Sequence, residues 1–282
     1  MDKRVWTLNF KDSLSALSDL MMPRVCLVCG RELTLREKLL CLPCSLDLPL
    51  TRFENWEHNP MANKYNERIG VTPDQIGGLY EPYQRAAALL YYWHGSGYAN
   101  IPQSLKYGRH FEAGRHFGAM LGRRLAASPL FADVELVVPV PLHWTRRLRR
   151  GYNQAEVIAR EIARELSATR AVLFAPRLLR RVRRTRTQTR MTISEKSLNV
   201  SGAFEVRSVH TLAAFGEGMC KKGLKRTYPL LFSGGYAQEI HHILLVDDVF
   251  TTGSTLTACH DALRKVFGPD VRISLATLSF AG

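Results

Sequence analysis

The sequence predicts an α/β domain with a mostly parallel sheet and helices on both faces, preceded by a small module that holds four cysteines. From about residue 79, short apolar segments alternate with amphipathic segments, as in proteins whose parallel strands are joined by helices. Two C-x2-C pairs lie before residue 50. The length of 282 residues allows one large domain and one small accessory module.

The first part of the chain is predicted to form the small module and a linker. Leu14, Leu17 and Met21 recur at helical spacing and predict a short amphipathic helix over about residues 8–21. This helix and the cysteine pairs fall within residues 1–50. Residues 51–78 are polar and rich in Asn, Pro and Glu, so they are predicted to be a linker.

The elements of the large domain, residues 79–282, follow from the spacing of their apolar residues. The predicted strands cover residues 86–92, 136–140, 243–246 and 272–278. The predicted helices cover residues 111–127, 153–166 and 254–267. The segment near 206–242 is rich in Gly and Lys without clear periodicity, and it is predicted to be an inserted loop or hairpin.

The cysteine spacing predicts a structural zinc site. Each C-x2-C pair can supply two thiolates to one tetrahedral ion, and all four ligand positions are then taken by protein. The alternative of two disulfides or free thiols is less compatible with the reducing cytoplasm, where we expect this chain to act. The predicted zinc ligands are Cys26, Cys29, Cys41 and Cys44.

The charge of the chain predicts an anionic partner. Lys and Arg total 39 against 25 for Asp and Glu, which gives a formal net charge of +14. Such an excess favours nucleic acid or a phosphorylated metabolite. No apolar run approaches the roughly 20 residues that a membrane-spanning helix needs, and no secretory signal is evident, so we expect a cytoplasmic protein without a membrane span.

The segment 243–256 has the properties of a phosphate site. An apolar strand leads into Asp247 and Asp248, and a loop rich in hydroxyl groups then opens a helix. Backbone N–H groups and hydroxyls meet there at the positive end of the helix, and a glycine lets the backbone approach a phosphate closely. We expect the aspartates to contact ribose hydroxyls and to act in any catalysis. The predicted phosphate-binding residues are Thr251, Thr252, Gly253, Ser254 and Thr255.

Two arginine-rich segments are candidates for binding anions. Arg146, Arg147, Arg149 and Arg150 follow a predicted buried strand, where they can hold a diphosphate group or a DNA backbone. The nearby rings of Trp144 and Tyr152 are candidates for stacking on bases. The segment 177–190 is half arginine, and part of it is predicted to be a helix with one buried face. Its alternatives are a solvated surface or contact with nucleic acid.

Four motifs resemble those of known families. The segment VDDVFTTGST resembles the phosphoribosyl pyrophosphate (PRPP) motif of type I phosphoribosyltransferases. RRGYNQ at residues 149–154 is similar to the RRGxNQ segment of the ComF/GntX competence-associated family, and RRTRTQ with NVSGAF is similar to a later block of that family. SLKYG at residues 104–108 resembles its lysine-containing motif between a strand and a loop.

This resemblance implies a type I phosphoribosyltransferase-like fold, a zinc knuckle and the handling of incoming single-stranded DNA in natural transformation. Two functions follow from it. The first is a DNA-handling adaptor that binds PRPP or another ribose 5-phosphate ligand and meets a competence helicase and a recombination mediator. The second is a phosphoribosyltransferase that uses Mg²⁺ to pass ribose 5-phosphate from PRPP to an unknown nitrogen acceptor, with release of diphosphate.

Overall fold

The computed structural model describes residues 24–71, 82–107, 110–183, 202–207 and 240–282. The predicted N-terminal helix at 8–21 and nearly all of the predicted insertion lie outside these residues. The described chain divides into two compact units. The cysteine unit contains residues 24–49 and Trp93–Ile101, and the sheet unit contains the remainder, from Leu50 to Tyr92 and from Pro102 to Gly282.

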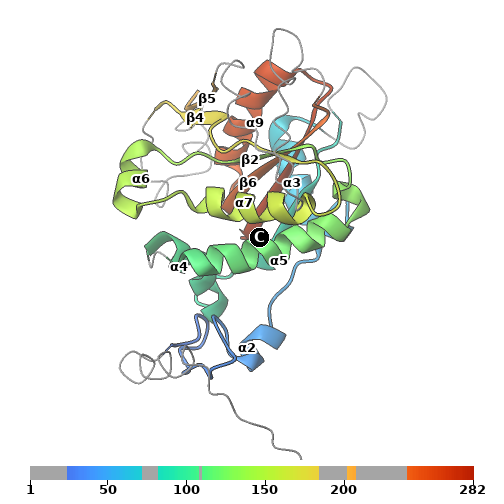
Figure 1. Cartoon of the computed structure of the whole chain (residues 1–282). Coiled ribbons are helices and arrows are strands. Elements are labelled where there is room, and N and C mark those ends of the chain that lie inside the picture. Colours follow the sequence, from blue (N-terminus) through green and yellow to red (C-terminus); the bar gives the residue numbers. More distant parts are fainter. Residues whose placement is uncertain (1–23, 72–81, 108–109, 184–201, 208–239) are drawn as a thin grey trace, which may run out of the picture. The chain divides into compact units, whose positions relative to one another are not determined.

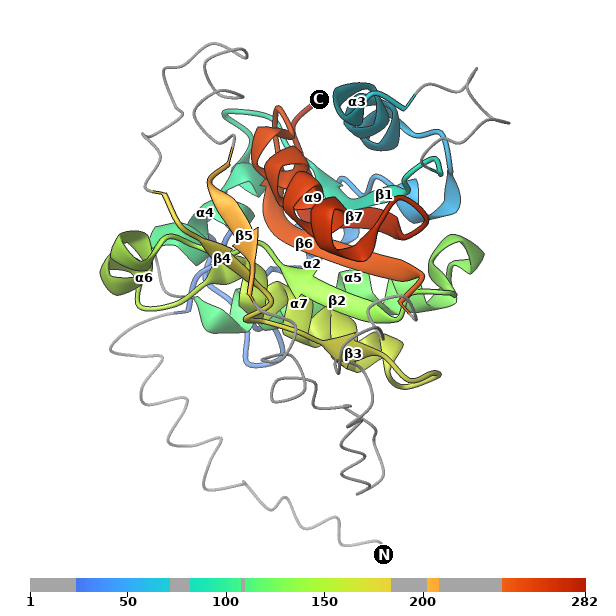
Figure 2. The ribbon, with the colours of Figure 1, turned by 90° about the horizontal axis from the view of Figure 1, so that it is seen from above.

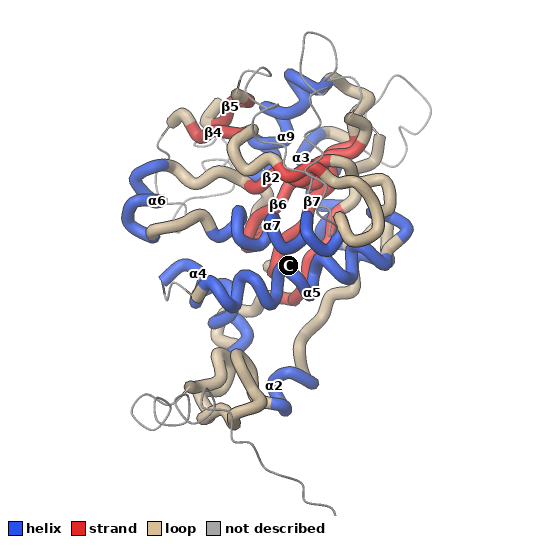
Figure 3. Tube along the Cα trace, viewed as in Figure 1, coloured by secondary structure: helices blue, strands red, loops and turns tan. Residues whose placement is uncertain are grey.

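The sheet unit is built on five parallel strands, shown in red in Figure 3. Every pairing between neighbouring strands of this sheet is parallel. Apolar, β-branched runs that are buried on both sides form such strands. Their spatial order is β1 (Ala86–Tyr91), β7 (Arg272–Phe280), β6 (His242–Phe250), β2 (Leu136–Pro139) and β3 (Leu173–Phe174).

Helices cover both faces of this sheet (Figure 1). The helices α5 (Phe111–Ala127) and α7 (Gln154–Leu166) lie side by side on one face, and α3 (Pro60–Ile69) and α9 (Ser254–Phe267) lie on the other. The structure therefore confirms the predicted α/β class with a parallel sheet. The predicted bounds of the helices at 111–127 and 254–267 are also confirmed.

Small residues let α5 and α7 approach each other closely. Gly114, Gly118 and Gly122 recur every four residues of α5 and so lie on one face of it. A Cβ atom at Gly118 would lie 3.1 Å from the backbone of Ile158, and one at Gly122 would lie 3.0 Å from the backbone of Ile162. The three glycines thus supply the surface against which α7 packs.

Residues 51–71 are not a linker, contrary to the prediction from their polar composition. Asn59 begins α3, because its Oδ1 atom accepts hydrogen bonds from the backbone N–H groups of Met61 and Ala62. Its amide nitrogen donates to the carbonyl oxygen of Ala86 at 2.8 Å. Met61, Ala62 and Tyr65 are buried in the core. The polar residues of this segment therefore cap α3 or lie on its exposed side, and a few apolar residues form its buried face.

Within the described part of the arginine-rich segment, residues 179–181 form a strand and not the predicted helix. Strand β4 (Leu179–Arg181) pairs antiparallel with β5 (Phe204–Val206) in a separate two-stranded sheet. Leu179 is buried and Arg180 is exposed, as alternation along a strand requires. Residues 184–190 lie outside the described residues.

The cysteine unit contains little regular structure. It includes the short helix α2 (Leu42–Leu46), the 3-10 helix η3 (Gly97–Ala99) and an isolated bridge between Val25 and Glu32. A Cβ atom at Gly97 would lie 2.5 Å from the carbonyl oxygen of Val28, so the segment of η3 packs directly on the first cysteine pair. Among the described helices of both units, none combines the length and the apolar character needed to cross a membrane.

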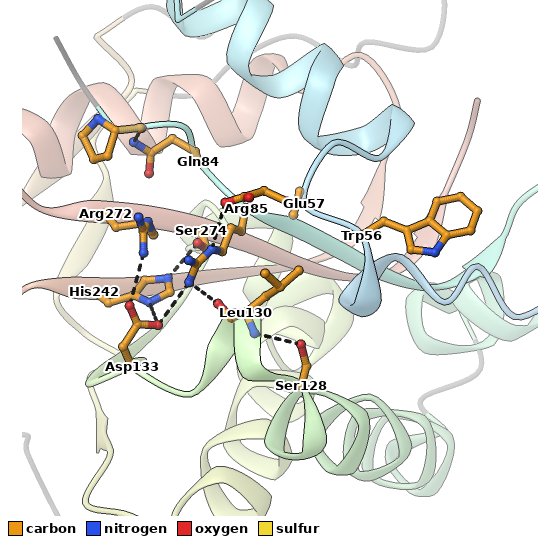
Figure 4. A network of polar contacts seen from close by, with 12 residues as sticks. Trp56, Glu57, Gln84, Arg85, Ser128, Leu130, Asp133, His242, Arg272 and Ser274 are labelled. Atoms are coloured by element: carbon orange, nitrogen blue, oxygen red, sulfur yellow. Dashed lines mark hydrogen bonds and ion pairs between the residues drawn. The ribbon is translucent and has the colours of Figure 1, made fainter. Parts of the chain in front are cut away.

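An ion cluster joins the amino ends of the parallel strands in the sheet unit (Figure 4). The Asp133 carboxylate accepts a hydrogen bond from His242 Nδ1 at 2.8 Å and contacts the guanidinium groups of Arg85 at 3.3 Å and Arg272 at 3.2 Å. His242 Nε2 lies 2.7 Å from the Ser274 hydroxyl. The hydrogen bond from His242 lowers the pKa of Asp133, and burial lowers the pKa of His242. An ionised carboxylate thus faces a neutral imidazole.

This cluster stabilises the fold. Because His242 is 1% exposed and Ser274 is 0% exposed, neither side chain can meet a substrate. An ionised carboxylate can only accept hydrogen bonds, so Nδ1 carries the imidazole hydrogen and Nε2 accepts from the serine hydroxyl. The three groups resemble a catalytic triad in their order, but the burial of His242 and Ser274 assigns the cluster to structure.

Replacement of Asp133 by alanine is expected to lower the free energy of unfolding by about 1–3 kcal/mol, because a buried imidazole N–H loses its acceptor. The pKa of Asp133 is lowered on folding, so its contribution is complete above its unfolded pKa of about 4 and is lost as the pH falls below that value. Urea denaturation of wild type and Asp133→Ala at pH 7 and pH 3 measures both effects.

Glu205→Ala is the matched control for this variant. Glu205 pairs with Arg180 at 3.0 Å, but both side chains are exposed, so its loss should cost less than about 1 kcal/mol. If Asp133→Ala were no more costly than this control, or if its cost were the same at both pH values, the cluster would have no stabilising role.

Candidate functional site

The candidate site lies at the carboxyl ends of β2 and β6. These neighbouring strands pair up to Pro139 and Val246, and the Val140 N–H donates to the carbonyl oxygen of Val246 at 2.8 Å. From β2 the sheet continues outward to β3, whereas from β6 it continues the opposite way to β7. Ligands of open parallel sheets bind at such a change of direction, outside the carboxyl ends of the strands. The two segments predicted to bind anions follow these two strands.

The two aspartates have different surroundings. Strand β6 extends beyond its predicted end and includes both of them. Asp247 accepts a hydrogen bond from the backbone N–H of Asp248 at 2.8 Å. The Asp248 carboxylate lies 3.0 Å from the Nζ atom of Lys106. Asp248 thus faces a cation, whereas the Asp247 carboxyl turns back onto its own strand.

Burial and neighbouring charges shift the pKa values of Asp247 and Lys106. Burial, with the neighbouring Asp248 carboxylate, raises the pKa of Asp247 to about 8. Burial would lower the pKa of Lys106, but the attraction of Asp248 outweighs it and raises that pKa. Near neutral pH, Lys106 and Asp248 therefore form an ion pair beside a largely protonated Asp247.

The hydroxyl-rich loop lies at the start of α9, as predicted. Gly253 is the residue before the first turn, with a φ of +75°. Ser254 and Thr252 have their hydroxyl oxygens 3.0 Å apart. Arg68, from α3, donates a hydrogen bond to the Ser254 hydroxyl at 3.0 Å. The loop therefore brings hydroxyl groups and one guanidinium to the positive end of a 14-residue helix.

Gly253 is also a packing position. A Cβ atom there would lie 2.9 Å from the ring of Phe250 and 3.2 Å from the Cδ atom of Arg68, and its positive φ disfavours any side chain. A Gly253→Val variant would therefore do more than block a phosphate. That variant would strain the loop itself, so it cannot separate binding from folding.

The predicted anion-binding arginines lie on the helix α6 (Trp144–Arg150). Arg147 is exposed, and Arg150 donates a hydrogen bond to the Gln154 side chain at 3.2 Å. The charge of Arg150 opposes protonation of Lys106. Burial, together with the charge of Arg146, lowers the pKa of Arg181. The side chain of Arg149 lies outside the described residues.

Three residues of the RRGYNQ segment brace the site. The Tyr152 hydroxyl and the Gln154 amide both donate hydrogen bonds to the carbonyl oxygen of Leu105, at 2.6 Å and 3.1 Å. Asn153 donates to the carbonyl oxygen of Val140 at 3.0 Å, just beyond the end of β2. These contacts fix the end of α6 to β2 and to the residue that precedes Lys106.

Tyr152 is therefore not a candidate for stacking on a base. Its side chain is 7% exposed and its ring packs on that of Phe111, with the centroids 4.1 Å apart. Trp144, by contrast, is 65% exposed at the start of α6. Of the two aromatic candidates near the arginines, only Trp144 presents its ring to solvent.

The structure adds three cations to the predicted site: Arg68, Lys106 and Arg181. Lys106 lies near the end of the helix α4 (Asn100–Tyr107), so the expectation that its motif joins a strand to a loop is wrong. The SLKYG motif was the signal in the sequence that could have identified Lys106 as a site residue. Arg68 falls in the segment predicted to be a linker, and its sequence environment carries no signal.

The four predicted zinc ligands are brought together in the cysteine unit. Their Sγ atoms all lie within 4.8 Å of one another, and those of Cys29 and Cys41 are 3.6 Å apart. Four sulfurs placed about 2.3 Å from a tetrahedral zinc ion are about 3.8 Å apart. The separation of Cys29 and Cys41 is too long for a disulfide bond of about 2.0 Å. The geometry fits a metal ion bound by four thiolates.

Backbone geometry holds the sulfurs in place. The Gly30 N–H donates to the carbonyl oxygen of Cys26 at 2.9 Å, and Gly30 has a φ of +73°, so it closes the first turn. Glu37, which the sequence did not identify, accepts hydrogen bonds from the N–H groups of Thr34 and Leu42 at 2.9 Å and 2.6 Å. It thereby fixes the loop between the two cysteine pairs.

The thiols differ in their protonation. Burial raises the pKa of Cys26, but backbone hydrogen bonds from Cys29, Cys41 and Val28 outweigh burial and lower the pKa to about 6. Burial and the neighbouring sulfurs raise the pKa of Cys44 well above its ordinary value. One thiolate forms readily, and a bound cation would compensate the charge of the others.

The described residues thus define a mixed α/β protein with a polar site at the carboxyl ends of two parallel strands and a four-cysteine cluster capable of binding metal. No family model matches the chain. Competence protein F of Haemophilus influenzae is 30% identical to it over 139 residues, which cover 49% of this chain and 48% of that relative. The chain thus spans about half the length of the curated relative it matches. This similarity confirms the predicted resemblance to the ComF family.

Proposed function

We propose that this chain is a cytoplasmic ComF-type protein that acts in competence, with a type I phosphoribosyltransferase-like fold that binds PRPP or another ribose 5-phosphate ligand and single-stranded DNA. The similarity to Competence protein F supports the biological role. The cluster of cysteine sulfurs supports a zinc ion bound by Cys26, Cys29, Cys41 and Cys44.

One observation carries the ligand part of the proposal. Two carboxyl groups at the carboxyl end of β6 precede a loop of hydroxyls at the start of α9, and Lys106 faces Asp248. A 5-phosphate suits the loop, and the ribose hydroxyls can form hydrogen bonds with the two carboxyl groups. Lys106 and Arg150 supply positive charge for a diphosphate group. The carboxyl oxygens of Asp247 and Asp248 could hold Mg²⁺, which would supply positive charge for a diphosphate group.

The arginines of α6 support the DNA part of the proposal. An exposed Arg147 and an exposed Trp144 lie on one short helix, next to Arg146. Arginines that contact phosphates give salt-dependent affinity, and an aromatic ring that stacks on a base adds affinity that salt does not change. The net charge of +14 is consistent with a polyanionic partner.

The second candidate is an active phosphoribosyltransferase. In that reaction a nitrogen nucleophile forms a bond to C1 of the ribose as the bond to diphosphate breaks, and the diphosphate carries away the electron pair. Lys106, which pairs with Asp248, and the neighbouring Arg150 favour this candidate, because these cations would stabilise the developing negative charge. Release of diphosphate from PRPP in the presence of a nitrogen acceptor distinguishes it from an adaptor.

The DNA part of the proposal is tested by salt dependence. Each phosphate contact on a single strand contributes about −0.7 to the log–log slope of affinity against salt, so Arg146→Ala with Arg147→Ala should make the slope shallower by up to about 1.4. Trp144→Ala should lower affinity by about 1–3 kcal/mol at an unchanged slope. Fluorescence anisotropy with a labelled oligonucleotide at several salt concentrations measures both effects.

Arg123→Ala is the control, since Arg123 is an exposed arginine of α5 paired with Glu165. It should leave the slope unchanged. If the α6 double variant also kept the wild-type slope and instead lost affinity for PRPP, the arginines would hold only the diphosphate group and DNA would bind elsewhere or not at all.

A further inference from the structure

Arg68 contacts the loop at the start of α9 from a distant part of the sequence. It lies in the last turn of α3 and is separated from Ser254 by 186 residues. Its guanidinium donates to the Ser254 hydroxyl at 3.0 Å, and that hydroxyl in turn contacts Thr252. Its Cδ atom packs on Gly253. Arg68 is therefore part of the loop's surroundings and not only a surface residue of α3.

The charge of Arg68 is not balanced by the described residues around it. No carboxylate among them forms a salt bridge with its guanidinium, and its Nε atom is buried without a hydrogen-bond partner there. The start of α9 carries the positive end of the helix dipole, where a cation is unfavourable. A guanidinium, a positive helix end and two hydroxyls in one place are complementary to an anion with several acceptor oxygens.

Arg68 has one further favourable interaction, with the negative end of its own helix α3. That interaction requires only a cation in the last turn. It does not require a guanidinium directed at the Ser254 hydroxyl and packed on Gly253. Stabilisation of α3 therefore does not explain why Arg68 contacts the loop.

We propose that Arg68 binds the terminal phosphate monoester of the ligand in the loop 251–255 and makes this site selective for the dianion. The inference rests on the proposed function of that loop. A monoester carries close to two negative charges above its second pKa of about 6, whereas a phosphodiester carries one. The same group occurs on ribose 5-phosphate and on the 5′-phosphorylated end of a DNA strand.

The test is calorimetric titration of the full-length protein with ribose 5-phosphate at pH 5 and pH 7.5. Wild type should bind more tightly at pH 7.5. Arg68→Gln should weaken binding at pH 7.5 about ten-fold or more, as expected for loss of a charged hydrogen bond, and should flatten the dependence on pH. Arg68→Lys should restore part of the affinity at pH 7.5 and part of its dependence on pH. Lys64→Gln, which removes a cation one turn earlier on α3, should behave as wild type.

Two outcomes distinguish the inference from the function on which it rests. If wild type bound no ribose 5-phosphate at either pH, the proposed function of the loop would be wrong. If wild type bound and both Arg68 variants, with unchanged melting temperatures, kept its affinity and pH dependence, the inference alone would be overturned. If Arg68→Gln did not fold, a folded Arg68→Lys variant that kept both the wild-type affinity at pH 7.5 and the wild-type pH dependence would also overturn the inference, since an ammonium group lacks the planar set of donors of a guanidinium.

Oligonucleotides with a 5′-phosphate and with a 5′-hydroxyl identify the source of the monoester. Tighter binding of the phosphorylated strand by wild type, lost in Arg68→Gln, assigns the contact to a DNA end as well as to the sugar phosphate. Equal binding of the two strands, together with the expected ribose 5-phosphate result, assigns it to the free sugar phosphate. Both results support a monoester site that contains Arg68.

Discussion

Removal of zinc is expected to unfold the cysteine unit and to leave the sheet unit folded. The unit has few buried apolar side chains, and its chain is held by turns and by the four sulfurs. Zinc binding contributes about 10–16 kcal/mol in small zinc-binding peptides at neutral pH, which exceeds what so small a core supplies. Protein purified without chelator should contain one zinc ion per chain. Metal analysis, and circular dichroism before and after addition of a strong chelator, measure the two effects.

Substitutions refine this zinc test. Cys41→Ser should abolish zinc binding, since three remaining thiolates cannot complete the site. Cys259→Ala is the matched control, because Cys259 is a buried cysteine of α9 outside the cluster, and it should keep one zinc ion per chain. Wild-type protein without zinc, or a Cys41→Ser variant that retains one ion, would show that the cluster is not a zinc site.

Asn in place of either aspartate is expected to weaken binding, and at position 247 it is also expected to stabilise the fold. Asp248→Asn removes the partner of Lys106 and should weaken binding of PRPP with Mg²⁺ about ten-fold or more, because a charged contact is lost. Asp247→Asn keeps an acceptor for the Asp248 N–H and removes a charge that burial disfavours. It should therefore stabilise the fold while it also weakens binding of ribose.

The stabilisation by Asp247→Asn should depend on pH. The pKa of Asp247 is raised to about 8 in the folded chain, so its ionisation in the unfolded chain opposes folding increasingly as the pH rises from about 4 to about 8. The gain from Asn should be on the order of 1 kcal/mol at pH 7.5 and smaller at pH 5. Urea denaturation at the two pH values and calorimetry with PRPP measure these effects.

Asp261→Asn, at an exposed position of α9, is the control and should change neither stability nor affinity. Unchanged PRPP affinity in both Asp247→Asn and Asp248→Asn would mean that these carboxyl groups do not contact the ligand.

The helices and strands that were predicted correctly have strong apolar periodicity. The helix at 111–127 alternates small and large apolar residues at helical spacing, and the part of β6 before the aspartates is a continuous apolar run. The end of the strand at 243–246 was predicted too early, because β6 continues through two polar residues, Asp247 and Asp248, to Phe250, and pairing with β7 satisfies the backbone there.

The segment at 51–71 was misinterpreted because capping residues look like loop residues. Asn59 and Pro60 are common in turns, but an Asn before a helix and a Pro in its first turn are also helix-start signals. The burial of Phe53, Met61 and Tyr65 depends on contacts with strands far along the chain, and local sequence cannot show such contacts.

The same limit applies to the site. The loop 251–255 and the aspartates are contiguous, so their motif was visible in the sequence. Lys106 and Arg68 reach them from α4 and α3, and only the fold brings these cations to the loop. Tyr152 was misassigned because an aromatic residue beside arginines has the composition of a nucleic-acid site, whereas its hydroxyl is directed at the Leu105 carbonyl.

The most direct test of the proposed function is a calorimetric titration of wild-type protein with PRPP and Mg²⁺, run in parallel with single-stranded DNA at two salt concentrations. The account predicts one PRPP bound per chain, and DNA affinity that falls as salt rises, with a log–log slope of about −0.7 for each phosphate contacted. The absence of PRPP binding, together with DNA affinity that does not change with salt, would contradict it.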